Sequence, residues 1–480
     1  MTRMAPAMRS AAANLWRRAE LVRARLAAVS SLPGPPGEPL LGNLRQVPQE
    51  TMHQVFEDWA DTYGSVYRVL MAHVPFVIIS DPVMIREVLR RRPDDFRRLK
   101  VMTDTLVDMG IDGVFAADGD VWRRQRRLVM PAFKRGRIGR ALPMMSRVAH
   151  RLRDIWWTNV DQVRDIRADC AGFTADVTSL VAFGVDLDTL RQPSRLRRQI
   201  DIIFDTLGRR IRTPVPYWRY IKLSADRECD RALTAVGDTV RRILRAPPDD
   251  DTRATLLQGM REARLEEQPD RGLSEDELVA NVLTILLAGE DTTASTLAWT
   301  IDALARYPAI QERMRAEVHE VLGERDAPMD LETAERLRYQ RAVFQETLRV
   351  RSPTPFIYLE SARQVRLGSL ELPPGVPVIA LTRHTSMAED AFLEASVFRP
   401  ERWLQLTREP PGFAPFGGGP RLCPGLHLAL LESQVLLSVL LRHFRIEPAR
   451  AAAPVERIGF TMQPASVPVR LTALTTAKRA

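Results

Sequence analysis

The chain has 480 residues, of which 45% are hydrophobic, so it can bury a large core. Its formal net charge is +9, mostly from arginine, and this balance suits nucleic acid, a membrane surface or an acidic protein equally well. Only three cysteines occur, Cys170, Cys229 and Cys423, and none lies in a CxxC pair. This excludes a disulfide framework, argues against structural zinc and favours a reducing compartment.

Residues 1–31 predict a basic amphipathic helix, because apolar residues recur there at helical spacing among arginines. These apolar positions are Leu15, Val22, Leu26 and Val29. No apolar run reaches the roughly 20 residues that span a bilayer, and arginines interrupt any secretory signal. We expect the helix to pack one stripe on its own domain, with weak contact to a membrane surface as the alternative. The protein is expected in the cytoplasm.

Residues 32–480 predict one large helical domain with small sheets. A stiff connector rich in proline covers Leu32 to Gly37, and the pattern is helical over most of Pro82 to Val350. A further helix is expected at 52–63, and strands near 65–70, 75–79, 365–372, 376–381, 460–462 and 467–471. We therefore predict a mainly α fold with small peripheral β-sheets (α+β).

One helix is predicted to be far longer than average. Ser274 and Glu277 form a capping box at its start, and Pro308 ends it. Its centre is apolar from Leu283 to Ala288, and the motif Gly289-Glu290-Asp291-Thr292-Thr293 follows. Glycine inside a helix costs about 1 kcal/mol relative to alanine, and a buried acid costs more unless it is paired. Such a motif at the centre of the longest helix indicates a functional site.

The strongest local signal surrounds Cys423. A glycine-rich loop, 416–422, precedes this cysteine, and an apolar helical run, 426–441, follows it. A thiol at a helix N-terminus meets free backbone amides and the positive end of the helix dipole, which favour the thiolate. Arg421 adds a cation two residues away.

This loop resembles the haem-binding loop of the cytochrome P450 family, Phe-x-x-Gly-x-Arg-x-Cys-x-Gly, at every fixed position. The resemblance implies the P450 fold, of the soluble bacterial type, and haem b (iron protoporphyrin IX). It implies Cys423 as the axial ligand of the haem iron, with electron donation from the thiolate favouring O–O cleavage. It further implies that Phe416 shields the sulfur, that Arg421 binds a haem propionate and that Gly425 allows close approach to the porphyrin.

Three further motifs follow the family's order. Glu346 and Arg349 match Glu-x-x-Arg, and the resemblance implies a buried network of these two with Arg402 that supports the cysteine loop. Trp122 and Arg126 match a helix motif that binds the propionates. Ala288 to Thr293 matches the oxygen-activation motif, in which Ala288 lies against the haem, Gly289 thins the helix where dioxygen fits, Thr292 hydrogen-bonds dioxygen and Asp291 relays protons. Glu290 is the alternative relay.

The chain departs from the family in two places. Many relatives carry an Arg or His near Ile357, where this chain has Thr354–Leu359, so propionate binding there is open and Tyr358 is a candidate substitute. The common His-Arg-Asp turn is Arg383-His384-Thr385, which we leave unassigned. His427 is expected to be an exposed helix residue. By position in the family, the substrate pocket includes Pro355, Phe356, Ile357, Tyr358 and Phe460, an apolar set that suits a hydrophobic molecule.

The resemblance implies a monooxygenase that activates dioxygen with two external electrons and inserts one oxygen atom into a hydrophobic substrate such as a lipid or terpenoid, by hydroxylation or epoxidation. The sequence has no flavin or nucleotide motif, so a separate electron donor is expected. A haem-thiolate isomerase, dehydratase or peroxygenase is one alternative, disfavoured by the Asp291–Thr292 pair, and a non-catalytic haem sensor is another. The three classes can be separated by what turnover requires. The requirement is a reductant with dioxygen in one case and peroxide alone in another, and in the third case no turnover occurs.

Positive charge concentrates in one short stretch: Arg123, Arg124, Arg126, Arg127, Lys134, Arg135, Arg137 and Arg140. The aromatic residues of base-stacking surfaces are missing there, so we do not expect nucleic acid as a partner. In the family this stretch lies on the cysteine side of the haem. We expect it to receive a small acidic redox protein, a ferredoxin or flavodoxin served by a reductase.

Overall fold

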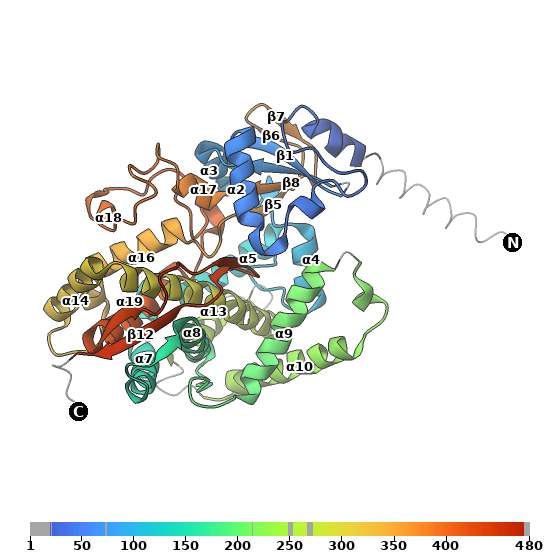
Figure 1. The fold of residues 1–480 in the computed structure, drawn as a ribbon. Helices are drawn as coiled ribbons and strands as arrows, with labels where there is room; N and C mark the ends of the chain where they lie inside the picture. The colour runs from blue at the N-terminus through green and yellow to red at the C-terminus, as the bar shows by residue number, and fades with distance from the viewer. Residues whose placement is uncertain are drawn as a thin grey trace. The chain divides into compact units, whose positions relative to one another are not determined.

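A computed structural model describes residues 20, 22–72, 74–213, 215–247, 253–265 and 272–474 (Figure 1). In these residues the protein is mainly helical with small sheets, so the predicted α+β class is confirmed. The chain divides into two compact units of interleaved segments. The first consists of Met1–Lys100, Thr354–Ala395 and Pro410–Leu422, and the second of Val101–Pro353, Ser396–Glu409 and Cys423–Ala480. A single catalytic domain over 32–480 stays a prediction.

The first unit is built on a five-stranded sheet with the order β1-β2-β8-β5-β3. The strands are β1 (Val66–Met71), β2 (Val74–Ile79), β3 (Phe96–Arg97), β5 (Ile357–Ser361) and β8 (Pro377–Ala380). β1 and β2 form the predicted antiparallel hairpin, with Tyr67 opposite Ile78, and β2 pairs with β8 in parallel. A second hairpin joins β6 (Val365–Leu367) to β7 (Leu370–Leu372). Helices α2 (Met52–Tyr63), α3 (Pro82–Arg90) and α17 (Thr382–Ser386) complete this unit, with the short turns η1 (Leu44–Gln46), η2 (Gln49–Thr51) and η5 (Gly419–Arg421).

The described part of the N-terminal helix packs on this unit. Residues 22–29 are helical, and Val29 is buried in the same core as Val77, Leu359 and Val378. Arg25 donates a hydrogen bond of 3.1 Å from Nε to the carbonyl of Pro374. These contacts support packing on its own unit over membrane contact for 22–29, whereas the predicted position Leu15 lies outside the described residues. Within the described part of the chain, no helix has the length and apolar character needed to cross a bilayer.

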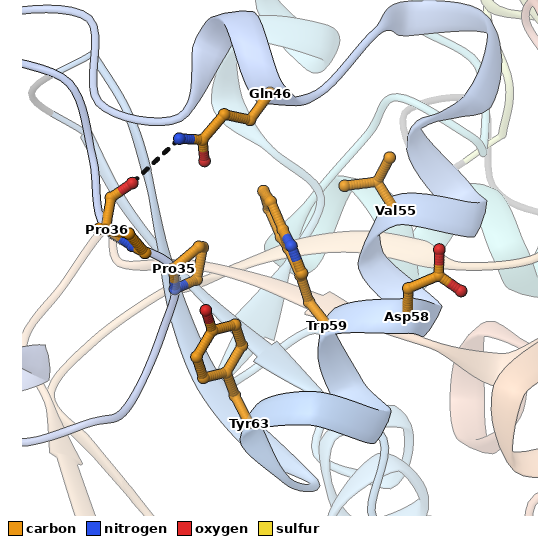
Figure 2. A pocket seen from close by; sticks show the side chains of 7 residues that line it. All are labelled: Pro35, Pro36, Gln46, Val55, Asp58, Trp59 and Tyr63. Carbon is orange, nitrogen blue, oxygen red and sulfur yellow. Dashed lines mark hydrogen bonds between the residues drawn. The ribbon is translucent and has the colours of Figure 1, made fainter.

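The proline connector is fixed by hydrogen bonds. The Pro33 carbonyl accepts from the amide of Arg68 at 2.9 Å, and the Pro36 carbonyl accepts from Gln46 Nε2 at 3.0 Å. Figure 2 shows the surface pocket that the connector forms with α2, where Pro35 lies beside the rings of Trp59 and Tyr63. The pocket contains none of the predicted site residues.

The second unit is a helical assembly around α13 (Glu275–Arg306), which packs along α8 (Ile166–Phe183) and also contacts α10 (Ser224–Arg245) (Figure 1). Its core contains Leu283, Leu297 and Ile301 of α13. The other helices and turns of this unit are α4 (Lys100–Asp108), α5 (Gly119–Val129), η3 (Met130–Phe133), α6 (Arg135–Gly139), α7 (Leu142–Thr158), α9 (Arg195–Arg212), η4 (Tyr217–Arg219), α12 (Leu256–Leu265), α14 (Pro308–Leu322), α15 (Leu331–Arg336), α16 (Arg338–Val350), α18 (Arg402–Gln405) and α19 (Leu426–His443).

Two small sheets lie in the second unit. One has the order β4-β12-β9, from β4 (Val163–Asp165), β9 (Phe444–Pro448) and β12 (Pro468–Ala473), and the other pairs β10 (Glu456–Ile458) with β11 (Met462–Pro464). The strand predicted at 460–462 begins only at Met462, so Phe460 lies in the turn before β11.

The long helix begins and ends where the sequence predicts. The Ser274 hydroxyl accepts from the amide of Glu277 at 3.0 Å, and the Glu277 carboxylate accepts from the amide of Ser274 at 2.9 Å. These two bonds satisfy amides that a helix start otherwise leaves free. Pro308 has no amide to continue the helix and instead begins α14.

Candidate functional site

Cys423 lies just before α19, which begins at Leu426. The cysteine is half-buried and forms no disulfide. A side chain added at Gly425 would meet Cys423 Sγ at 3.7 Å, an ordinary contact, so this part of the chain could accommodate more than glycine there. The other two cysteines, Cys170 and Cys229, are fully buried, and burial raises the pKa of both thiols. Cys423 is therefore the cysteine with access to a ligand.

Helix α5 brings a half-buried cation, Arg126, toward this cysteine. Trp122 and Arg126 are one turn apart, which places them on the same face of α5, and Trp122 is buried. Burial lowers the pKa of Arg126, and the nearby Cys423 opposes that effect electrostatically. A half-buried guanidinium in the field of a thiolate suits an anionic group such as a carboxylate.

The centre of α13 is accessible, although the helix around it is buried. Ala288 and Asp291 are exposed, and Gly289 and Thr292 are half-buried, whereas almost all residues from Leu278 to Leu287 and from Thr293 to Ala305 are buried. The Thr292 hydroxyl donates to the carbonyl of Ala288 at 2.7 Å. Positions 288, 291 and 292 share one side of a helix, so this side meets open space at the motif.

The two acids of the motif have different surroundings. The Glu290 carboxylate is buried and pairs with Arg197 of α9 at 2.5 Å. Burial raises the pKa of Glu290 to about 7, and Arg197 opposes the rise. Although part of Asp291 is exposed, the protein around its carboxyl limits hydration and so raises its pKa, and the charges of Arg197 and Arg167 oppose the rise. The sequence does not predict Arg197 as a partner, because nothing in the local sequence of α9 indicates a residue more than 90 positions away.

The structure brings Glu346, Arg349 and Arg402 together in a fully buried network. Arg349 donates to both carboxylate oxygens of Glu346, at 2.9 and 2.8 Å, and Arg402 Nε lies 3.2 Å from Glu346 Oε1. Trp403 adds a bond of 2.8 Å from its indole nitrogen to Glu346 Oε2. This fourth member was missed, although Trp403 directly follows Arg402 in the motif. A buried carboxylate with this many donors is held in one geometry.

Two loop residues predicted to contact haem, Phe416 and Arg421, belong to the first unit and are half-buried. Gly419 shapes the loop between them: its φ is +63°, and a side chain there would lie 2.5 Å from the Leu89 carbonyl oxygen. Both conditions require glycine, because L-residues rarely adopt that φ and the α3 backbone leaves no space.

The predicted pocket residues are spread over both units. In the first unit, Phe356 stacks edge-on against Phe56 of α2, with ring centres 6.0 Å apart, and the Tyr358 hydroxyl is 3.2 Å from Met52 Sδ. Alternation along a strand then directs Ile357 to the opposite face. Pro355 is buried, and Phe460, in the second unit, is exposed.

The residues that the sequence left unassigned have structural partners. Arg383 binds the Glu57 carboxylate, and His384 Nε2 lies 2.8 Å from Asp61 Oδ1, so α17 is attached to α2 by ion pairs. His427 is exposed, as expected; partial burial and the cations Arg135 and Arg341 lower its pKa.

Part of the basic stretch is not available to a partner. Arg124 binds the Glu277 carboxylate and donates to the Gly272 carbonyl at 2.9 Å, at the start of α13. Arg137 binds Glu262, and Arg135 binds Glu335. The Arg124 side chain therefore supports the start of α13, and it is not a free member of the surface expected to receive a redox protein.

The mainly helical fold, with a half-buried cysteine before α19, is accompanied by a clear match to a known family. The family model of cytochrome P450 matches residues 32–469, which is most of the chain. The chain belongs to the cytochrome P450 family and is a haem-dependent monooxygenase, an oxidoreductase that uses dioxygen and a redox partner.

Similar proteins are found in plants. Cytochrome P450 716A67 of Medicago truncatula is 26% identical over 426 residues, covering 84% of this chain and 80% of the relative. The 11-oxo-beta-amyrin 30-oxidase of Glycyrrhiza uralensis is 29% identical over 413 residues, covering 81% and 77%. Cytochrome P450 72A13 of Arabidopsis thaliana is 28% identical over 418 residues, covering 82% and 79%. These plant relatives do not support the soluble bacterial type expected from the sequence.

Proposed function

We propose that the chain binds haem b through Cys423 and inserts one oxygen atom of dioxygen into a hydrophobic small molecule. The observation that carries the assignment is the position of Cys423: a half-buried thiol before α19, in the field of the half-buried Arg126. When bound, the haem supplies reductive activation of dioxygen, and a thiolate ligand favours O–O cleavage.

The residues present fit such a group. The half-buried Arg126 suits a propionate, with Trp122 on the same face of α5, and Arg421 of the loop is the second propionate candidate. Space beside Gly425 suits a flat ring system next to the sulfur. Phe416 is assigned to shield the sulfur, and the network of Glu346, Arg349 and Arg402 to hold the segment before the loop in one geometry.

On α13, the accessible face of Ala288, Asp291 and Thr292 is assigned to the oxygenation chemistry. The Thr292 hydroxyl, which now donates to the Ala288 carbonyl, can turn to donate to a ligand, because a hydroxyl rotates freely about its C–O bond. Asp291 is the carboxyl that exchanges protons with solvent beside it, since it is exposed, whereas Glu290 is buried and ion-paired.

For the substrate we propose an apolar molecule of the lipid or terpenoid class. One relative is, by its name, an oxidase of 11-oxo-beta-amyrin, which supports the terpenoid class. Ile357 and Pro355 are the better pocket candidates in the first unit, because Phe356 and Tyr358 contact α2. We further propose a ferredoxin or flavodoxin as electron donor and a cytoplasmic location, in line with three cysteines that form no disulfide.

The ligand assignment is tested by the spectrum of the reduced carbonyl complex. Cys423→Ala should abolish the thiolate signature of that spectrum, because no other accessible thiol can replace the ligand. Cys170→Ala and Cys229→Ala are matched controls and should leave it intact. An unchanged spectrum in Cys423→Ala would refute the proposed function.

A further inference from the structure

The two acids in the α13 motif lie on different sides of the helix. Successive residues are about 100° apart around an α-helix, so Glu290 lies nearly opposite Thr292, and Asp291 lies between them. Burial agrees with this geometry, because Glu290 is buried while Asp291 is exposed. A carboxyl on the far side of the helix cannot share the surroundings of the Thr292 hydroxyl.

Arg197 holds Glu290 on that far side. Its Nη2 atom is 2.5 Å from Glu290 Oε1 and 2.8 Å from Asp201 Oδ1, one turn along α9. The Asp201 side chain is 46% exposed and that of Glu290 10%, so the chain of three charges runs from the surface into the protein. A guanidinium carries five donors and keeps its proton at any working pH, so Arg197 provides a fixed charge and does not carry protons itself.

The charged groups that act on this pair come from three helices. α9 contributes Arg197 and Asp201, α8 contributes Arg167, and α13 contributes the two acids themselves. Arg197 is the main positive neighbour of both acids, and it opposes the effect of burial on the pKa of each. Arg167 is also bound to Gln463 at 2.8 Å, which fixes its position.

We propose that Arg197 is a positioning residue of the oxygenation site: it binds Glu290 away from Thr292 and leaves Asp291 as the carboxyl that exchanges protons there. The inference rests on the proposed roles of Thr292 and Asp291. It also gives Glu290 a purpose distinct from catalysis, because the buried carboxylate anchors the cation whose field reaches Asp291.

Infrared difference spectroscopy of the haem-containing protein tests this directly, because a protonated carboxyl has its own C=O band. The bands of the two acids are assigned by their loss in Glu290→Gln and Asp291→Asn. In Arg197→Met, both titration midpoints should rise, by about 1–3 pH units, because the stabilising opposite charge is gone. The double variant Arg197→Met/Glu290→Gln removes both members of the buried pair, so neither charge is left unpaired. Its Asp291 midpoint should still be higher than in Glu290→Gln alone, because the charge of Arg197 is absent.

Two controls keep the result interpretable. Arg197→Lys retains the charge and should restore most of the wild-type midpoints. Arg241→Met removes an arginine of α10 that pairs with the exposed Asp276, and it should change neither midpoint. If Arg197→Met does not fold, Arg197→Gln, which removes the charge but keeps hydrogen-bond donors for Glu290, tests the same point: the Asp291 midpoint should rise.

Three outcomes would overturn the proposal. An unchanged Asp291 midpoint in Arg197→Met, or in Arg197→Gln where only that variant folds, would leave Arg197 as a purely structural partner of Glu290. The third outcome concerns coupling, measured as peroxide released per reductant consumed with laurate as probe substrate. If Glu290→Gln uncouples turnover as strongly as Asp291→Asn, Glu290 is itself the relay. Full coupling in Thr292→Ala would instead contradict the proposed function, and the infrared midpoints would still report on Arg197.

Discussion

At the scale of single residues, Glu290 gives the protein a pH dependence that can be measured. Its pKa is raised from 4.5 to about 7 by burial, so the folded chain binds this proton more tightly than the unfolded chain. Between about pH 4.5 and 7 the folded state therefore carries the extra proton, and its stability falls as pH rises through that window. The full effect is roughly 3 kcal/mol, since one pKa unit corresponds to about 1.4 kcal/mol.

Glu290→Gln removes this titration. Relative to the wild type, the variant should gain stability as pH is raised from 5 to 8, because only the wild type loses its bound proton there. Urea unfolding at both pH values measures the difference. Glu275→Gln, in the first turn of the same helix and partly exposed, is the control and should show a much smaller change. Equal behaviour of the two variants would mean that burial does not perturb Glu290.

Single residues also show which parts of the site the sequence could predict. Cys423, Arg126 and Thr292 are predicted from the sequence because each stands in a motif whose members are close along the chain. Arg197 is not predicted as a partner, since its ion pair joins positions far apart in the sequence, whereas Trp403 directly follows Arg402 in a motif that could have indicated it. The sequence also could not predict that Glu290 is buried while Asp291 is exposed. Neighbouring positions in a helix differ in burial only through what packs against them.

At the scale of elements, Gly289 has a packing role in the structure. A side chain at this position would meet Thr178 Cγ2 of α8 at 2.9 Å, so glycine allows α13 and α8 to approach closely. This contact explains the glycine without reference to dioxygen, whereas the sequence suggested only that Gly289 thins the helix above the iron. The two roles are compatible, because the glycine and the accessible face at Thr292 lie on adjoining sides of α13.

Gly289→Ala should therefore destabilise the protein, although alanine alone favours a helix by about 1 kcal/mol. The added methyl group must displace the Thr178 side chain, and overpacking of this kind costs about 1–3 kcal/mol. Thermal unfolding should show a lower midpoint in the single variant. The double variant Gly289→Ala/Thr178→Ala should recover much of the loss, because the contacting atoms are gone. A stable single variant would remove the packing explanation.

The helices were easier to predict than the strands. α13 has a capping box at one end and a proline at the other, and both signals are local, so its bounds were correct within one residue. The strands β5 and β9 were not predicted, because short strands depend on partners such as β8 and β12 that lie elsewhere in the chain. The strand near 460 was displaced, which removes Phe460 from the sheet.

At the scale of the whole molecule, arginines divide between structural and surface roles. Arg124 and Arg137 look like members of one basic surface in the sequence, yet they bind Glu277 and Glu262. Charge counts alone cannot separate the two roles, because each pair joins segments more than 100 residues apart. The net charge of +9 is still left after internal pairing, since pairing conserves the total.

The docking of an acidic electron donor should depend on the exposed part of the basic stretch. Arg127 and Lys134 are exposed. Arg127→Glu/Lys134→Glu should slow reduction by a ferredoxin, because long-range attraction between the two proteins is weakened. The wild-type rate should fall as salt rises, with screening over about 8–10 Å at physiological ionic strength, and the variant should show a weaker salt dependence. Stopped-flow reduction under carbon monoxide measures both.

Peroxide-driven turnover bypasses the donor and should be nearly unchanged in this variant. Arg231→Glu, an exposed arginine of α10 outside the stretch, is the matched control and should slow reduction much less. Arg124→Glu is expected to differ from all of these, because it places a carboxylate against Glu277 at the start of α13 and so should lower stability and both activities. If the Arg127 and Lys134 substitutions reduced both activities together, the defect would lie in haem incorporation, and the electron donor would have to bind elsewhere.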